Sequence, residues 1–159
     1  MARDSAGILL YRHKGTTREI ELLIAHPGGP LWATRDEGAW SIVKGEIEDR
    51  EAPEAAARRE LAEELGPRVA APLARLPLIA LGEIRQRAGK IVHAWAAKGE
   101  VDPAAVRSAT FEMAWPPRSG RMATFPEIDR VAWVTPDRAR ALLNAAQVEL
   151  VDRLLAALA

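Results

Sequence analysis

Apolar residues in this 159-residue chain gather in short runs that alternate with polar turns. Short runs rich in aliphatic and aromatic residues are typical of strands, and the stretches with Gly and Pro between them are typical of turns. Strands are expected at residues 5–11, 19–25, 38–44, 76–84, 90–97, 110–115 and 130–134.

The stretch at residues 53–65 has the features of a helix instead. Pro53 suits the first helical turn, because it lacks an N–H group that would have no partner there. Gly66 follows as a C-terminal cap, and Pro67 is expected to prevent the helix from continuing. On a helical wheel Ala57, Leu61 and Leu65 fall on one arc, which predicts a face that packs on a core.

A second helix is expected at residues 137–158, with a break near Asn144. Thr135 supplies an N-cap, and Pro136 suits the first helical turn. The apolar stripe of this helix either completes the core or forms a dimer contact, so a homodimer is left open. Strands on both sides of a central helix, closed by a C-terminal helix, predict an α/β fold with a mixed β-sheet between helices.

Three carboxylates, Glu60, Glu63 and Glu64, share one arc of the first helix. Like charges at this spacing repel one another by a few tenths of a kcal/mol for each pair. A hard divalent cation would reverse that repulsion, since Mg²⁺ prefers oxygen ligands. The alternative is a solvated acidic face that pairs with Arg58 and Arg59.

The residues around these carboxylates help to decide between a cation site and a solvated acidic face. The order is Gly45, five residues, Glu51, seven residues, Arg59-Glu60-Leu61, one residue, Glu63-Glu64, one residue, Gly66. It resembles the Nudix box, G-x5-E-x7-R-E-U-x-E-E-x-G-U, in which U is a bulky aliphatic residue. The final position differs, because Pro67 stands where the box has an aliphatic residue.

The resemblance implies a Nudix-type α/β/α sandwich that spans residues 1–159 as a single domain. It implies that Glu60, Glu63 and Glu64 are catalytic and hold Mg²⁺ or Mn²⁺, with the backbone carbonyl of Lys44 as a further ligand. It also implies an ion pair between Glu51 and Arg59 that fixes the loop against the helix. The implied activity is hydrolysis of a diphosphate linkage in a nucleoside diphosphate joined to another group.

Two segments outside the box are candidates for substrate contacts. Residues 26–32 form a loop rich in Pro and Gly, in which His26 is expected to donate to a substrate oxygen and Trp32 to bind substrate. The alternative is an ordinary strand exit with a structural histidine.

The second segment is a loop at residues 116–129, in which residues 116–121 are expected to be irregular and basic. Arg118 and Arg121 are candidate phosphate ligands, and Trp115 and Phe125 are candidates for base stacking. Glu127 is a candidate metal ligand or catalytic base, because many Nudix enzymes use an acidic residue outside the box. The alternative is a surface loop before a strand.

The sequence leaves the substrate class open. Trp40-Ser41-Ile42-Val43-Lys44-Gly45, which leads into the box, is similar to branches that act on dinucleoside polyphosphates, and nucleoside triphosphates remain open. The alternatives are an ADP-ribose or nucleotide-sugar pyrophosphatase, and a non-catalytic nucleotide sensor on the same scaffold.

The composition argues against several kinds of partner and site, but it does not indicate a function. The 22 basic and 22 acidic residues cancel, so no global charge attracts duplex nucleic acid or an anionic membrane. The chain contains no cysteine, which excludes a thiol nucleophile and cysteine-ligated zinc. The apolar run at residues 6–10 is too short for a signal sequence or a membrane span, and a cytoplasmic protein is expected.

Overall fold

Strand β1 (Ser5–His13) lies inside the main sheet of the computed structural model, which describes residues 3–159. The strand order is β4-β5-β1-β2-β8, and β3 also pairs with β1. The other strands are β2 (Ile20–Pro27), β3 (Val43–Glu46), β4 (Ile79–Arg85), β5 (Ile91–Lys98) and β8 (Ile128–Val134). Because β5 runs parallel to β1 while the other pairs are antiparallel, the sheet is mixed, as predicted.

One edge of β1 is shared between two strands. Residues 5–8 pair with β3, whereas residues 11–13 pair with β2. A strand was predicted at residues 38–44, but β3 begins only at Val43, and residues 40 and 41 make only isolated bridges. Since β2 and β3 do not pair along their length, a cleft opens between them.

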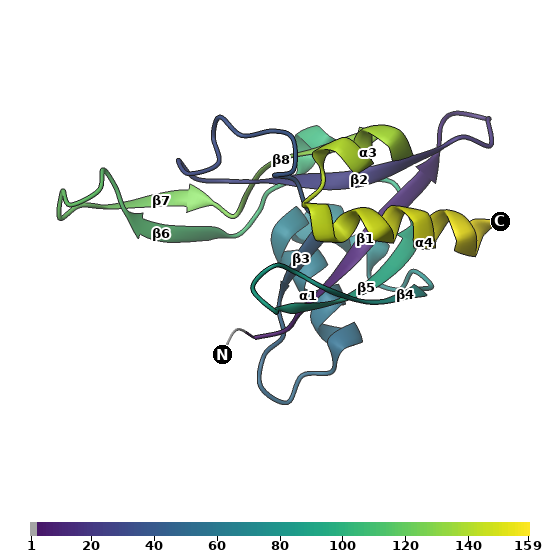
Figure 1. Ribbon diagram of the computed structural model, residues 1–159, viewed down its shortest axis with the longest axis horizontal. Helices are drawn as coiled ribbons and strands as arrows, with labels where there is room; N and C mark the ends of the chain where they lie inside the picture. The colour runs from purple at the N-terminus through teal and green to yellow at the C-terminus, as the bar shows by residue number, and fades with distance from the viewer. Residues whose placement is uncertain (1–2) are drawn as a thin grey trace.

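The two faces of the sheet carry separate cores because side chains alternate along β1. Leu9 and Tyr11 belong to a core that includes Leu150 and Leu154 of the C-terminal helix. Ile8 and Leu10 belong to a core on the opposite face, which includes Leu61 of the box helix. The helices thus cover both faces, and the predicted α/β/α sandwich is confirmed (Figure 1).

The box helix α1 (Pro53–Leu65) has the predicted bounds. Pro53 occupies the first turn, and Gly66 ends the helix with a φ of 92° and an N–H bond to the carbonyl of Ala62. That positive φ suits glycine, which lacks a Cβ. Pro67 does stop α1, but it also begins a second short helix, α2 (Pro67–Ala70), which leads into the 3₁₀ turn η1 (Ala71–Leu73).

The C-terminal segment is broken where the sequence predicts. Helix α3 (Pro136–Leu142) starts after the Thr135 cap, and α4 (Val148–Leu158) follows the 3₁₀ turn η3 (Ala145–Gln147). Gln147 is buried in the gap, where it accepts from the Ile42 N–H and donates to Ser41 Oγ and Gln86 Oε1. This side chain ties the helical layer to the strand that leads into the box.

Residues 110–126 differ from the prediction. The strand expected at residues 110–115, which is β6 (Thr110–Ala114), was predicted to join the main sheet, and residues 116–129 were predicted to be a loop. Instead β6 pairs with β7 (Met122–Pro126) in a separate two-stranded sheet, after the 3₁₀ turn η2 (Pro103–Ala105). This hairpin projects from the body of the molecule (Figure 1). Within residues 3–159, no helix is both long enough and apolar enough to cross a bilayer.

Candidate active site

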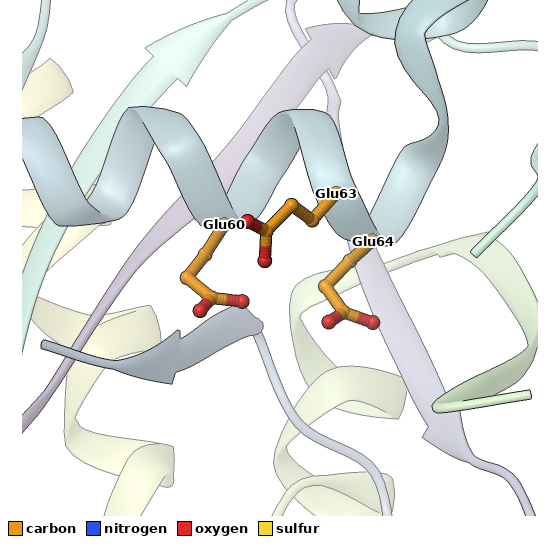
Figure 2. A group of neighbouring side chains, drawn as sticks. All are labelled: Glu60, Glu63 and Glu64. Atoms are coloured by element: carbon orange, nitrogen blue, oxygen red, sulfur yellow. The ribbon is translucent and has the colours of Figure 1, made fainter. Parts of the chain in front are cut away.

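The carboxylates of Glu60, Glu63 and Glu64 converge on one side of α1 (Figure 2). One oxygen from each lies within 4.8 Å of the others. Glu60 and Glu64 are each only 7% exposed, whereas Glu63 is exposed. Positions i, i+3 and i+4 share one helix face, which is why the sequence brings these three groups together.

Arg59 connects this cluster to the loop that precedes α1. Its guanidinium donates to both oxygens of Glu51, at 2.7 and 2.9 Å, and to the carbonyl of Glu46 at 2.9 Å. The remaining Nη1 donates to Glu60 at 2.8 Å and to Glu63 at 3.2 Å. The predicted pair of Glu51 and Arg59 is present, and Arg59 also orients two of the carboxylates.

Gly45 allows Glu60 to reach its position. A Cβ at residue 45 would lie 2.0 Å from the carboxyl carbon of Glu60. The carboxylate of α1 therefore rests directly on the backbone of β3. The glycine that opens the box motif thus keeps space for a box carboxylate.

Burial makes the negative charge of this cluster costly. The pKa of Glu64 rises to about 8 because the group is buried and lies beside the charges of Glu60, Glu127 and Glu63. Burial also raises the pKa of Glu60, although Arg59 opposes the shift. Glu64 Oε2 is buried and has no hydrogen-bond partner. A buried carboxylate oxygen without a donor fits a site that receives a cation.

The cleft between β2 and β3 collects further polar groups beside the cluster. Its volume is about 190 Å³, and its lining includes Glu64, Lys44, Glu127 and Ser41. Burial, with a smaller contribution from Lys90, lowers the pKa of the Lys44 ammonium to about 8. Burial raises the pKa of Glu127. The structure thus brings Glu127 and Glu64 to the same cleft, and the role of Glu127 as a metal ligand or catalytic base stays a prediction.

An apolar cavity of about 170 Å³ adjoins this cleft. The two spaces share Pro27 and Glu127 in their linings. Trp32 forms part of its wall, as do Leu31 of the same loop and Phe111 and Met113 of β6. A planar apolar group in this cavity would lie next to the polar cleft.

His26 does not face this space. Its side chain is fully buried, with Nδ1 2.9 Å from Asp129 Oδ1 and Nε2 2.6 Å from the carbonyl oxygen of Arg35. The predicted contact of His26 with a substrate oxygen is therefore corrected, because both ring nitrogens face protein acceptors. These contacts fit the alternative, in which His26 is a structural histidine at the exit of a strand.

The two predicted phosphate ligands of the hairpin lie apart from the cluster. Arg118 and Arg121 lie in and just after the turn that joins β6 to β7. Neither lines the cleft or the apolar cavity. Phe125 packs against Phe111, with ring centroids 5.9 Å apart, so it supports the cavity wall from behind.

Sequence reasoning missed three residues of this site. Phe111 and Met113 were assigned to a strand of the main sheet. Their alternation along the strand does not show that they face the loop of Leu31 and Trp32. The side chain of Lys44 was also missed, because only its carbonyl was considered. A lysine directly before the box glycine, at a position that the strand buries, was the available signal.

Comparisons with known proteins agree with this architecture. A family model described as the NUDIX domain matches residues 1–154. Among solved structures, Ap4A hydrolase from C. elegans in a binary complex has a TM-score of 0.66 and 21% identity over 98% of both chains.

Two further solved structures are similar. The NUDIX domain of NrtR from Shewanella oneidensis, complexed with ADP ribose, has a TM-score of 0.64 and 15% identity over 100% of this chain and 90% of that one. The MutT protein from Methanosarcina mazei Go1 has a TM-score of 0.59 and 17% identity over 99% and 97% of the chains. At such identities these structures show the fold. A comparison with curated proteins found no match. Since the family model covers nearly the whole chain and the box residues converge on one site, the chain belongs to the Nudix hydrolase family.

Proposed function

We propose that this protein hydrolyses a diphosphate linkage in a nucleoside diphosphate joined to another group, such as a dinucleoside polyphosphate or a nucleoside triphosphate. The observation that carries the proposal is the convergence of Glu60, Glu63 and Glu64 within 4.8 Å beside an open cleft. Three carboxylates in a partly buried position repel one another unless a cation or protons compensate their charge.

The donor set fits a divalent cation, Mg²⁺ or Mn²⁺. Its ligands would be Glu60, Glu63 and Glu64, with the carbonyl of Lys44 as the further ligand that the family resemblance implies. All of these atoms are oxygens, which hard cations prefer, and the unpartnered Oε2 of Glu64 offers a free lone pair. A bound cation would supply neutralisation of phosphate charge and activation of a water for attack.

The chain's own residues supply orientation and a proton acceptor. Arg59 holds Glu60 and Glu63 in place through Nη1, and Glu51 holds Arg59. Lys44 also lines the cleft, and its ammonium would attract a phosphate there. Glu127 or one of the box carboxylates takes the proton of the attacking water, because these carboxylates lie at or beside the cleft.

The apolar cavity supports a nucleotide substrate. Trp32 and Phe111 offer aromatic surfaces to a base, and Glu127 marks the junction with the cleft where phosphates would lie. Arg118 and Arg121 stay predicted phosphate contacts. A homodimer and a cytoplasmic location likewise stay predictions.

An alternative substrate class is ADP-ribose or a nucleotide sugar. The likeness to the NrtR domain complexed with ADP ribose favours including this class. A non-catalytic nucleotide sensor on the same scaffold is a further alternative. The presence of every box carboxylate favours catalysis over sensing. The sensor predicts binding without turnover, so hydrolysis separates the two.

The test is to incubate the purified protein with Mg²⁺ or Mn²⁺ and nucleoside triphosphates, dinucleoside polyphosphates or ADP-ribose. Chromatography of the products identifies the substrate class and the broken bond. We expect cleavage of one class that a chelator abolishes. If folded, metal-loaded protein binds these nucleotides but cleaves none of them, the proposed hydrolase is wrong and the sensor is favoured.

A further inference from the structure

His26 occupies an unusual position for a polar residue. It lies at the end of β2, and none of its surface is exposed. Its ring meets the indole of Trp40 edge-on, with centroids 5.2 Å apart. A buried imidazole with this surrounding has to satisfy both ring nitrogens within the protein.

The two ring nitrogens of His26 contact different segments of the chain. Nδ1 lies 2.9 Å from a carboxylate oxygen of Asp129 on β8, and Nε2 lies 2.6 Å from the backbone carbonyl of Arg35 on the loop between β2 and β3. The buried ring therefore bridges β8 and this loop.

Charged groups surround this ring. On β8, Asp129 carries a negative charge, and Arg130 Nη1 lies 3.3 Å from Asp129 Oδ1 and 3.4 Å from His26 Nδ1. On the loop between β2 and β3, Asp36 accepts from Trp40 Nε1, and Arg35 lies over the ring of Trp32. On α3, Arg138 pairs with Asp36 at 3.8 Å. Asp129 is the carboxylate in direct contact with His26, so it is the main charged partner of the ring.

The two hydrogen bonds of His26 join both walls of the proposed nucleotide site. Arg35 belongs to the loop that carries Trp32, and Asp129 lies two residues after Glu127 on the chain. Trp32 and Glu127 line the same apolar cavity. The strand pairing is irregular next to this point, where the register shifts between His26 and Pro27. Side-chain bonds thus hold the walls where the backbone ladder is interrupted.

We propose that His26 is a positioning residue that holds the Trp32 loop against β8 and so sets the affinity for the nucleotide base. The effect on affinity rests on the proposed function, whereas the clamp itself does not. When a substitution removes one of the two contacts, the group left behind loses its partner and the loop is held less firmly. Loop order and nucleotide affinity then fall.

Two substitutions separate the two bonds of the clamp. The amide nitrogen of His26→Asn falls near the place of Nδ1, so it keeps a donor for Asp129 and loses the bond to Arg35. The amide nitrogen of His26→Gln falls near the place of Nε2, so it keeps a donor for Arg35. Both leave some empty volume. His13→Gln, at an exposed position of β1, is the matched control.

Hydrogen exchange without nucleotide measures the clamp directly. The reporters are the amides of Arg35, Gly38 and Ala39, which bond to the carbonyls of Trp32, Ala141 and Asp36. We expect protection at these amides to fall about tenfold in His26→Asn and less in His26→Gln, with no change in His13→Gln.

Calorimetry with Mg²⁺ and α,β-methylene-ATP measures the effect on affinity. We expect the Kd to rise about tenfold or more in His26→Asn and less in His26→Gln, while α1 keeps its protection from exchange. Loop protection that is unchanged in His26→Asn would overturn the clamp. A wild type that hydrolyses and binds no nucleotide would overturn the proposed function, while the exchange data still decide the clamp.

Discussion

Arg59 shows how single residues prepare the site. It binds Glu51 through two nitrogens, and its third nitrogen reaches the carboxylates that face the cleft. This arrangement lowers the pKa of Glu51 to about 2, through the Arg59 hydrogen bonds first and the N–H of Glu48 second. The same guanidinium therefore holds the loop and reduces repulsion within the cluster.

The pair of Glu51 and Arg59 predicts a pH-dependent contribution to stability. Because the pKa of Glu51 is lower in the folded protein than its ordinary value of 4.5, its contribution is present above about pH 4.5. It is lost as pH falls from there toward about 2. Glu51→Gln should therefore lower the free energy of unfolding at pH 7, and the difference from wild type should vanish near pH 2.

Urea unfolding at several pH values measures this difference. Glu48→Gln is the control, since Glu48 lies 3.8 Å from Arg59 and is 65% exposed. Wild-type stability of Glu51→Gln at pH 7 would show that the pair of Glu51 and Arg59 does not stabilise the folded protein.

Glu64 predicts the opposite dependence on pH when no cation is bound. Its pKa in the folded protein, about 8, lies above its ordinary value of 4.5, so the folded state binds more protons. The stability of the cation-free protein should therefore fall as pH rises from about 4.5 to about 8. Glu64→Gln should flatten this fall, because the amide does not ionise.

A cation should displace the proton of Glu64, which links binding to pH. We expect Mg²⁺ or Mn²⁺ to bind more tightly as pH rises toward 8, with release of about one proton for each ion at pH 7. Calorimetry in two buffers of different ionisation enthalpy measures the released protons. Binding without proton release, or equal release in Glu64→Gln, would contradict the raised pKa.

At the scale of elements, the shared edge of β1 creates the cleft. β3 and β2 each occupy part of that edge, and Gln147 of η3 reaches into the gap between layers. This one side chain satisfies the N–H of Ile42 and bonds to Ser41 and Gln86. The position of the segment before β3 thus depends on a residue more than a hundred positions away.

Gln147→Leu should destabilise the protein by about 1–3 kcal/mol, because it leaves the buried N–H of Ile42 without an acceptor. Gln86→Leu is the control, since Gln147 then keeps its bonds to Ile42 and Ser41, and a smaller effect is expected. Urea unfolding measures both. Equal destabilisation by the two substitutions would show that the bond to Ile42 is not the important one.

Local signals predicted α1 and the break after α3, because prolines, a glycine and a cap residue mark those ends. The hairpin of β6 and β7 was not predicted, since strand periodicity says nothing about which strand becomes the partner. His26 was misassigned for a related reason. Its neighbours Pro27 and Gly28 indicate a loop, whereas its burial depends on Asp129, which lies 103 residues away.

At the scale of the whole molecule, one rigid helix supplies the carboxylates and three loop or strand segments supply the substrate walls. Cleft and apolar cavity meet at Pro27 and Glu127, so chemistry and recognition lie side by side but come from different parts of the chain. This division explains why the box motif identifies the family while the substrate has to be found by assay.

The central claim is that the carboxylates on the cleft face of α1 carry out nucleotide hydrolysis. The most direct measurement is the kcat of Glu64→Gln with Mg²⁺ and the best substrate of the panel, beside Glu54→Gln. Glu54 lies in the first turn of the same helix, and its side chain is 57% exposed. We expect Glu64→Gln to lose turnover by orders of magnitude while remaining folded, and Glu54→Gln to match the wild type. Turnover of Glu64→Gln near the wild-type value would contradict the account.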